Sequence, residues 1–154
     1  MKRILSLTWS LLIFLSCGSN SSGKNETEPG TADTVMVNEV PFQRMKSGEK
    51  IYNRYCMACH QKDGSGIPKL YPPVSGTGMV LNNEEDLIKI IIEGMQGETI
   101  VLGKTYNNIM PRHDFLNNEQ IADLLTYVRN SFGNTAEAID KEKVSNVRQS
   151  LEEQ

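Results

Sequence analysis

The chain of 154 residues predicts a single domain of all-α fold. Three segments combine a helix-capping residue with apolar residues at helical spacing. The segments between them are rich in glycine and proline, and the sequence contains no strand-rich stretch or internal repeat. Hydrophobic residues make up 38% of the chain, and the glycines bring the apolar share into the ordinary globular range.

The first helix is expected over residues 47–56, with Ser47 as its N-cap and an apolar pair at i, i+4. The folded part is expected to begin near Phe42. Residues 35–40 alternate weakly between apolar and polar and end at a proline, which indicates an extended lead-in.

The second and third helices each follow a capping signature. Asn82-Asn83-Glu84-Glu85 precedes an isoleucine-rich run that ends at Gly94. That run could also form a strand, but the cap and stop signals favour a helix. Asn117-Asn118-Glu119-Gln120 precedes the third helix, which is expected to end before Gly133. Five apolar residues share one face of it: Ile121, Leu124, Leu125, Val128 and Phe132.

The N-terminus has the layout of an export signal. Two basic residues precede an apolar run of about 12 residues, shorter than the ~20 that span a bilayer, so residues 1–16 are expected to be a signal peptide. Phe14-Leu15-Ser16 before Cys17 resembles a bacterial lipobox, which implies a lipid anchor at Cys17. The alternative is cleavage near Cys17 with no lipid attached.

Residues 17–41 are expected to form a flexible linker between the lipid and the fold. From Gly18 to Gly30 no large apolar residue occurs, so this stretch cannot bury enough surface to offset its ordering entropy. The formal net charge of −3 argues against a nucleic-acid partner, and three cysteines are too few for a disulfide scaffold.

Cys56-Met57-Ala58-Cys59-His60 fits the C-x-x-C-H signature for attachment of c-type haem. Two thiols at this spacing can each form a thioether with a vinyl group of one porphyrin. The histidine that follows is then held where its imidazole becomes the proximal iron ligand. We therefore expect Cys56 and Cys59 to bind the haem and His60 to bind its iron.

Other uses of these residues explain less of the pattern. A thioredoxin-like redox pair would need a βαβ context, which the sequence lacks. A structural zinc site needs four ligands, and His113 and Cys17 are the only further histidine and cysteine. A disulfide between Cys56 and Cys59 would leave His60 without a role. In an exported chain, the motif favours haem c.

Residues 45–133 resemble a single-haem class I cytochrome c, in which three or more helices surround one covalently bound haem. The resemblance implies a methionine as the sixth iron ligand, on a loop before the last helix. Met110, followed by Pro111, occupies that place. A thioether favours ferrous iron and raises the reduction potential. Four other side chains could compete for the position of sixth ligand. Met57, Met79 and Met95 are instead expected to be core residues, and His113 is expected to be an exposed loop residue.

Further positions match the same family. Four residues match the crossing of the N- and C-terminal helices: Gly48, Tyr52, Leu124 and Tyr127. Pro72, in Pro72-Pro73-Val74-Ser75-Gly76, matches the proline whose carbonyl accepts the N–H of the proximal histidine. Tyr106 either donates a hydrogen bond to a haem propionate or packs at the loop edge.

With both axial positions filled, the iron has no open site for a substrate, so electron transfer is the expected function. The protein is expected to be an electron carrier rather than an enzyme, working with redox protein partners on the periplasmic side of a bacterial membrane. One alternative is a subunit dedicated to one dehydrogenase or reductase complex. The other is a haem peroxidase or gas sensor in which Met110 dissociates readily.

The polar tail over residues 134–154 has Val144, Val147 and Leu151 at helical spacing, which predicts a short helix docked on the domain. Similar tails occur on cytochrome modules associated with dehydrogenases and nitrite reductases. A role in partner binding is the alternative.

Overall fold

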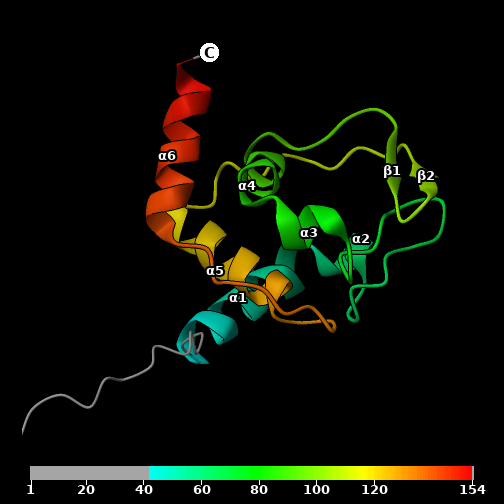
Figure 1. Ribbon diagram of the computed structural model, residues 1–154, viewed down its shortest axis with the longest axis horizontal. Coiled ribbons are helices and arrows are strands. Elements are labelled where there is room, and N and C mark those ends of the chain that lie inside the picture. The colour runs from blue at the N-terminus through cyan, green and yellow to red at the C-terminus, as the bar shows by residue number, and fades with distance from the viewer. Residues whose placement is uncertain (1–41, 154) are drawn as a thin grey trace, which may run out of the picture. The chain divides into compact units, whose positions relative to one another are not determined.

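The computed structural model describes residues 42–153, and within this range the fold is helical with one small antiparallel sheet (Figure 1). In chain order the elements are α1 (Phe42–Tyr55), α2 (Met57–His60), α3 (Gly78–Asn82), α4 (Glu84–Glu93), β1 (Thr99–Val101), β2 (Lys104–Tyr106), α5 (Asn118–Arg129) and α6 (Lys141–Glu152). The predicted all-α class is confirmed. The expected signal peptide, Cys17 and the linker lie outside the described residues. No helix over 42–153 combines the length and hydropathy of a membrane span.

The crossing of α1 and α5 forms the centre of the fold. A Cβ atom on Gly48 would lie only 2.1 Å from the carbonyl oxygen of Asp123, so the two backbones approach as closely as glycine allows. Next to this contact the rings of Tyr52 and Tyr127 lie 5.7 Å apart, and Leu124 is fully buried. The predicted crossing is therefore confirmed.

α1 begins at Phe42, five residues before the Ser47 that was predicted as its N-cap, so that prediction was wrong. Ser47 lies inside the helix, half-buried. Two reasons explain the late predicted start. A serine hydroxyl is compatible with a helix interior, and the apolar residues used for the prediction begin only at Ile51, so they say nothing about the turns before it.

α4 and α5 begin at the predicted caps. The side chain of Asn83 accepts a hydrogen bond from the Asp86 N–H at 3.1 Å, and Asn117 forms a complete capping box with Gln120. α5 ends at Arg129, earlier than predicted. Phe132 lies beyond the end of the helix and has a φ of 59°. Its ring packs against that of Tyr52 at a centroid distance of 5.0 Å.

Three short elements that the sequence did not predict lie between the expected helices. α3 has five residues, and the antiparallel strands β1 and β2 have three each, with Thr99 opposite Tyr106. Segments this short show no periodicity, and their hydrogen bonds depend on the surrounding fold.

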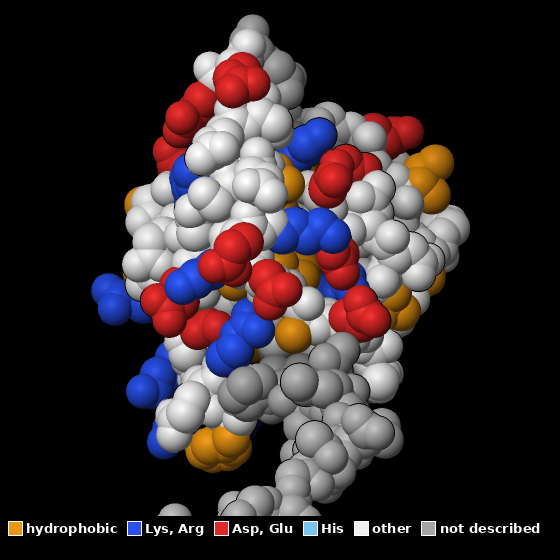
Figure 2. All heavy atoms as spheres, turned by 60° about the vertical axis from the view of Figure 1, so that its left-hand side comes forward, with side chains coloured by type: hydrophobic (Ala, Val, Ile, Leu, Met, Phe, Trp, Pro, Cys, Tyr) orange, Lys and Arg blue, Asp and Glu red, His pale blue; other side chains and the backbone are white. Residues whose placement is uncertain are grey.

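The polar tail carries α6, which lies across α4 and α5 and on the opposite side of them from the hairpin (Figure 1). Ile139 and Val144 are fully buried, and Val147 joins the same core cluster as Leu124. On the face that includes α6, acidic and basic side chains alternate and do not gather in a patch of one sign (Figure 2). The tail is thus an integral part of the packed domain.

Candidate functional site

The two cysteines of the attachment motif lie where α1 passes into α2. The Cys56 N–H donates to the carbonyl oxygen of Tyr52 at 2.8 Å, and the Cys59 N–H donates to the carbonyl oxygen of Cys56 at 3.1 Å. Because residues three apart in a helical turn share a side, both thiols line the same cavity. Cys56 is buried and Cys59 is half-buried.

Two cavities that open to solvent adjoin these cysteines, with volumes of about 610 Å³ and 680 Å³ that include the solvent space at their mouths. Four residues line both of them: Cys56, His60, Pro72 and Met110. We therefore treat the two as parts of one crevice. Its inner part is walled almost entirely by apolar side chains, among them Leu87, Ile91, Leu124 and Val128. A large apolar crevice with a few polar groups at its wall suits a flat, mainly hydrophobic cofactor.

His60 is oriented by the backbone of Pro72, as predicted. Nδ1–H of His60 donates to the Pro72 carbonyl oxygen at 2.9 Å, which leaves Nε2 as the nitrogen available to a metal. Burial lowers the pKa of His60, and although the hydrogen bond to Pro72 opposes this, the nearby His113 lowers it further. The neutral imidazole, the form that binds iron, is thus favoured.

Met110 lies on a segment fixed against the end of α4. The backbones of Met95 and Met110 exchange two hydrogen bonds of 2.9 Å. Gly94, which joins the end of α4 to Met95, has a φ of 76°. A Cβ atom on Gly94 would lie 2.4 Å from the Met110 carbonyl oxygen. Only glycine suits both this conformation and this approach.

The other methionines are placed less centrally. Met79 lines only the inner cavity and Met95 only the outer one. Met57 packs against the hydrophobic core and lines neither. Among the described methionines, Met110 alone lines both parts of the crevice.

His113 was predicted to be an exposed loop residue, and this prediction was wrong. Its side chain lines the outer cavity, and the residue is only 7% exposed. The rings of Tyr55 and Phe115 cover it, at centroid distances of 6.2 Å and 5.8 Å. Tyr55 comes from α1, far away in the sequence, so local patterns could not reveal the burial. Close to His113 in the sequence, one aromatic residue, Phe115, was the only signal of this burial.

The Nδ1 atom of His113 is the one buried side-chain nitrogen or oxygen within residues 42–153 that lacks a hydrogen-bond partner. A buried polar atom without a partner costs about 1–3 kcal/mol, so it usually marks a place where another group belongs. At the wall of a crevice that also holds two thiols and an imidazole, this atom fits a site built around a bound cofactor. Tyr106, at the end of β2 and 4% exposed, lines the same cavity.

Cys56 does not have the lowered pKa of a redox-active thiol. Burial raises the pKa of Cys56 to about 12, and the neighbouring Cys59 adds to the shift, whereas catalytic thiols have lowered pKa values. Within residues 42–153, no three His, Cys, Asp or Glu side chains are grouped to hold a metal ion.

A helical fold around a mainly apolar crevice, with a C-x-x-C-H motif at its wall, defines a c-type haem protein. Residues 45–132 match the cytochrome c family, and the chain belongs to that family.

The chain is similar to cytochrome c-552 of Thermus thermophilus, with 38% identity over 90 residues, which cover 56% of this chain and 68% of the relative. It is also similar to the cytochrome c subunit of a quinone alcohol dehydrogenase of Gluconacetobacter polyoxogenes, with 26% identity over 117 residues. The fructose dehydrogenase cytochrome subunit of Gluconobacter japonicus has 32% identity over 109 residues.

The match to the alcohol dehydrogenase subunit covers 75% of this chain but only 24% of that subunit. The match to the fructose dehydrogenase subunit covers 66% of this chain and 22% of that subunit. Family membership establishes the cofactor and the function in general terms. The protein binds haem c covalently and transfers electrons.

Proposed function

We propose that Cys56 and Cys59 form the two thioether bonds to the haem and that His60 and Met110 are its axial ligands. One observation carries this assignment. Of the four residues that line both parts of the crevice, one is an attachment cysteine and one is Pro72. The remaining two, His60 and Met110, have side-chain atoms that bind iron.

When bound, haem c supplies a reversible one-electron iron couple. The protein's part is to hold and tune it. Pro72 fixes the ring of His60, and the neutral thioether of Met110 favours the reduced state. The apolar inner wall keeps water away from the crevice, while Ile109, 64% exposed, lies at the rim of the outer cavity. We propose that Tyr106 donates to a haem propionate.

The ligand assignment is tested by replacing Met110 with leucine and, as matched controls, Met79 and Met95 with leucine. We expect the ferric wild type and both controls to show the Met–iron charge-transfer absorption and Met110→Leu to lack it. A wild type without this absorption would instead favour a peroxidase or gas sensor with an open iron position. Loss of the absorption in Met95→Leu alone would assign the ligand to Met95.

We further propose that the protein carries electrons between redox partners, as one member of a respiratory or dehydrogenase chain. Similarity to dehydrogenase cytochrome subunits favours a second possibility, a subunit dedicated to one such complex. Purification of the tagged protein at its natural abundance separates the two. A carrier elutes as a free small protein, whereas a subunit elutes with a dehydrogenase in constant ratio.

We also propose export and a lipid anchor at Cys17, which the basic and apolar start of the chain supports. Mass spectrometry of the mature protein is the test. An acylated Cys17 at the N-terminus supports the anchor, and an unmodified N-terminus near Cys17 supports simple secretion. In a Cys17→Ser variant, we expect the haem protein to leave the membrane fraction.

A further inference from the structure

Arg148, near the end of α6, binds the segment that leads from Met110 to α5. Its Nε–H donates to the side-chain oxygen of Asn118 at 2.9 Å. Its two Nη atoms donate to the carbonyl oxygens of Leu116 at 2.8 Å and Asp114 at 3.3 Å. One guanidinium thus holds two points of this segment and the first residue of α5.

The same segment is held elsewhere by other contacts. At its start Met110 pairs with Met95, and further on the His113 N–H donates to the carbonyl oxygen of Ile91 at 2.8 Å. Between these points Pro111 has no N–H to donate, and Arg112 is exposed. Beyond His113, the ring of Phe115 contacts Tyr55 of α1 at a centroid distance of 5.2 Å and Leu116 is buried in the core. Arg148 adds the hydrogen bonds that tie this stretch to α6.

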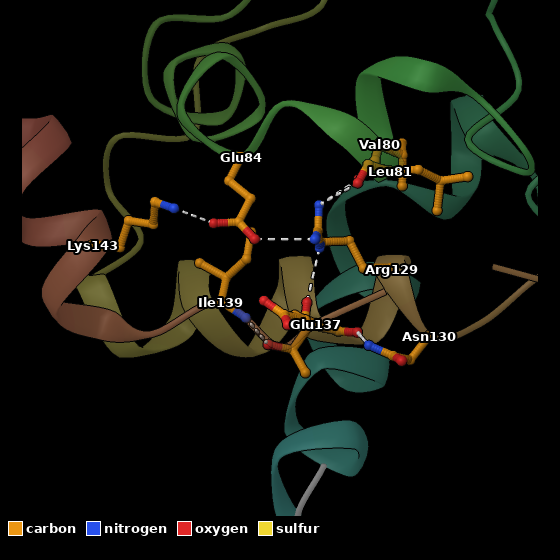
Figure 3. A network of polar contacts seen from close by, with 9 residues as sticks. Val80, Leu81, Glu84, Arg129, Asn130, Glu137, Ile139 and Lys143 are labelled. Carbon is orange, nitrogen blue, oxygen red and sulfur yellow. Dashed lines mark hydrogen bonds and ion pairs between the residues drawn. The ribbon is translucent and has the colours of Figure 1, made fainter. Parts of the chain in front are cut away.

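Arg148 can act in this way because α6 is itself fixed. Val144 and Val147 are buried in the core. Lys143 pairs with Glu84, at the start of α4, and Glu84 pairs with the buried Arg129, which also donates to the carbonyl oxygen of Val80 (Figure 3). α6 therefore makes two charged attachments. Lys143 binds the start of α4, and Arg148 binds the chain over residues 110–117, which we call the methionine segment.

We propose that Arg148 is a positioning residue for the axial methionine. By holding Asp114 and Leu116, it restricts the movement that would carry Met110 away from the crevice. This inference rests on the proposed assignment of Met110 as a ligand. It gives the C-terminal helix a role in the coordination of the iron.

The test compares Arg148→Gln with Lys143→Gln in the ferric holoprotein. Both remove one cation from α6, but only the first releases the methionine segment. Imidazole serves as the probe, since it binds the iron only when the methionine has left. We expect Arg148→Gln to bind imidazole about five- to tenfold more tightly than wild type, the size of coupling that contacting residues show. Lys143→Gln should bind it as the wild type does.

Unfolding in denaturant, followed by far-UV circular dichroism, shows whether both variants keep their fold. Arg148→Lys, which keeps one donor group, should recover part of the wild-type resistance to imidazole. Equal imidazole affinities in Arg148→Gln and Lys143→Gln, with the Met–iron absorption present, would overturn this inference and leave the ligand assignment intact. A wild type without that absorption would overturn both.

Discussion

The histidine and methionine sides of the crevice are held in different ways. His60 directly follows Cys59, and the carbonyl that fixes its ring belongs to Pro72, only 12 residues further on. Met110 lies 50 residues beyond His60. It is positioned by contacts to the end of α4 and, through Arg148, to α6.

The difference separates a proposed ligand that is encoded locally from a proposed ligand whose position depends on the assembled fold. The histidine side can form as soon as its own short segment meets the haem. We expect the methionine side to form only once α4 and α6 have packed, because its contacts come from the end of α4 and from Arg148 of α6. We therefore expect perturbations of the tertiary structure to reach Met110 before they reach His60.

The largest effect should come from removing the attachment itself. In Cys56→Ala/Cys59→Ala, we expect no covalently bound haem and little helical structure, because a domain of this size depends on the cofactor to complete its core. Mass spectrometry reports the missing haem, and far-UV circular dichroism reports the fold. Cooperative, near-native unfolding of the haem-free protein would contradict the expectation.

Replacing Met110 with alanine should affect one side of the crevice only. The haem stays attached and His60 stays in place, but the reduction potential falls by roughly 0.2 V, within the ~0.8 V range that axial ligands span. Potentiometric titration measures the shift. A potential equal to that of the wild type would show that Met110 is not the ligand.

Gly48→Ala and Gly94→Ala compare the α1–α5 crossing at the centre of the fold with the methionine side of the crevice. Each new Cβ would clash with a backbone oxygen, that of Asp123 for Gly48 and that of Met110 for Gly94, and we expect each to lower the free energy of unfolding by about 2–4 kcal/mol. In Gly94→Ala, the Met–iron absorption should disappear at lower denaturant concentration than the helical signal. In Gly48→Ala both signals should be lost together. Coincident loss in both variants would argue against separate control of the methionine side.

The smallest effect should follow from Pro72→Ala. The acceptor for His60 is a backbone carbonyl, which alanine also has, so the hydrogen bond can persist. We expect a shift in potential far smaller than that of Met110→Ala. A shift of similar size would mean that the fixed backbone geometry of proline, and not the carbonyl alone, orients the ring.

The sequence predicts features that depend on neighbouring residues and misses those that depend on residues far apart in the chain. The attachment motif and the caps Asn83 and Asn117 are short-range patterns, and the structure has both caps at the predicted residues. The burial of His113 depends on Tyr55 from another helix. The hold of Arg148 on Leu116 joins residues 32 positions apart.

Other differences have local physical causes. α1 begins before its predicted N-cap because Ser47 is tolerated within a helix, and α5 stops early because the chain turns at Phe132. α3 and the hairpin were missed because a few residues in each are too short to show a period.

The backbone pairing of Met95 with Met110 joins the two ends of the segment 95–110. The β1–β2 hairpin lies within this segment, beyond the pair. At its tip, Leu102 and Gly103 are exposed and both have positive φ. Residues added at the tip would lengthen the hairpin without pulling on the thioether below. The hairpin therefore offers a position at which a peptide could attach this cytochrome to an electrode surface while the proposed ligands His60 and Met110 keep their places.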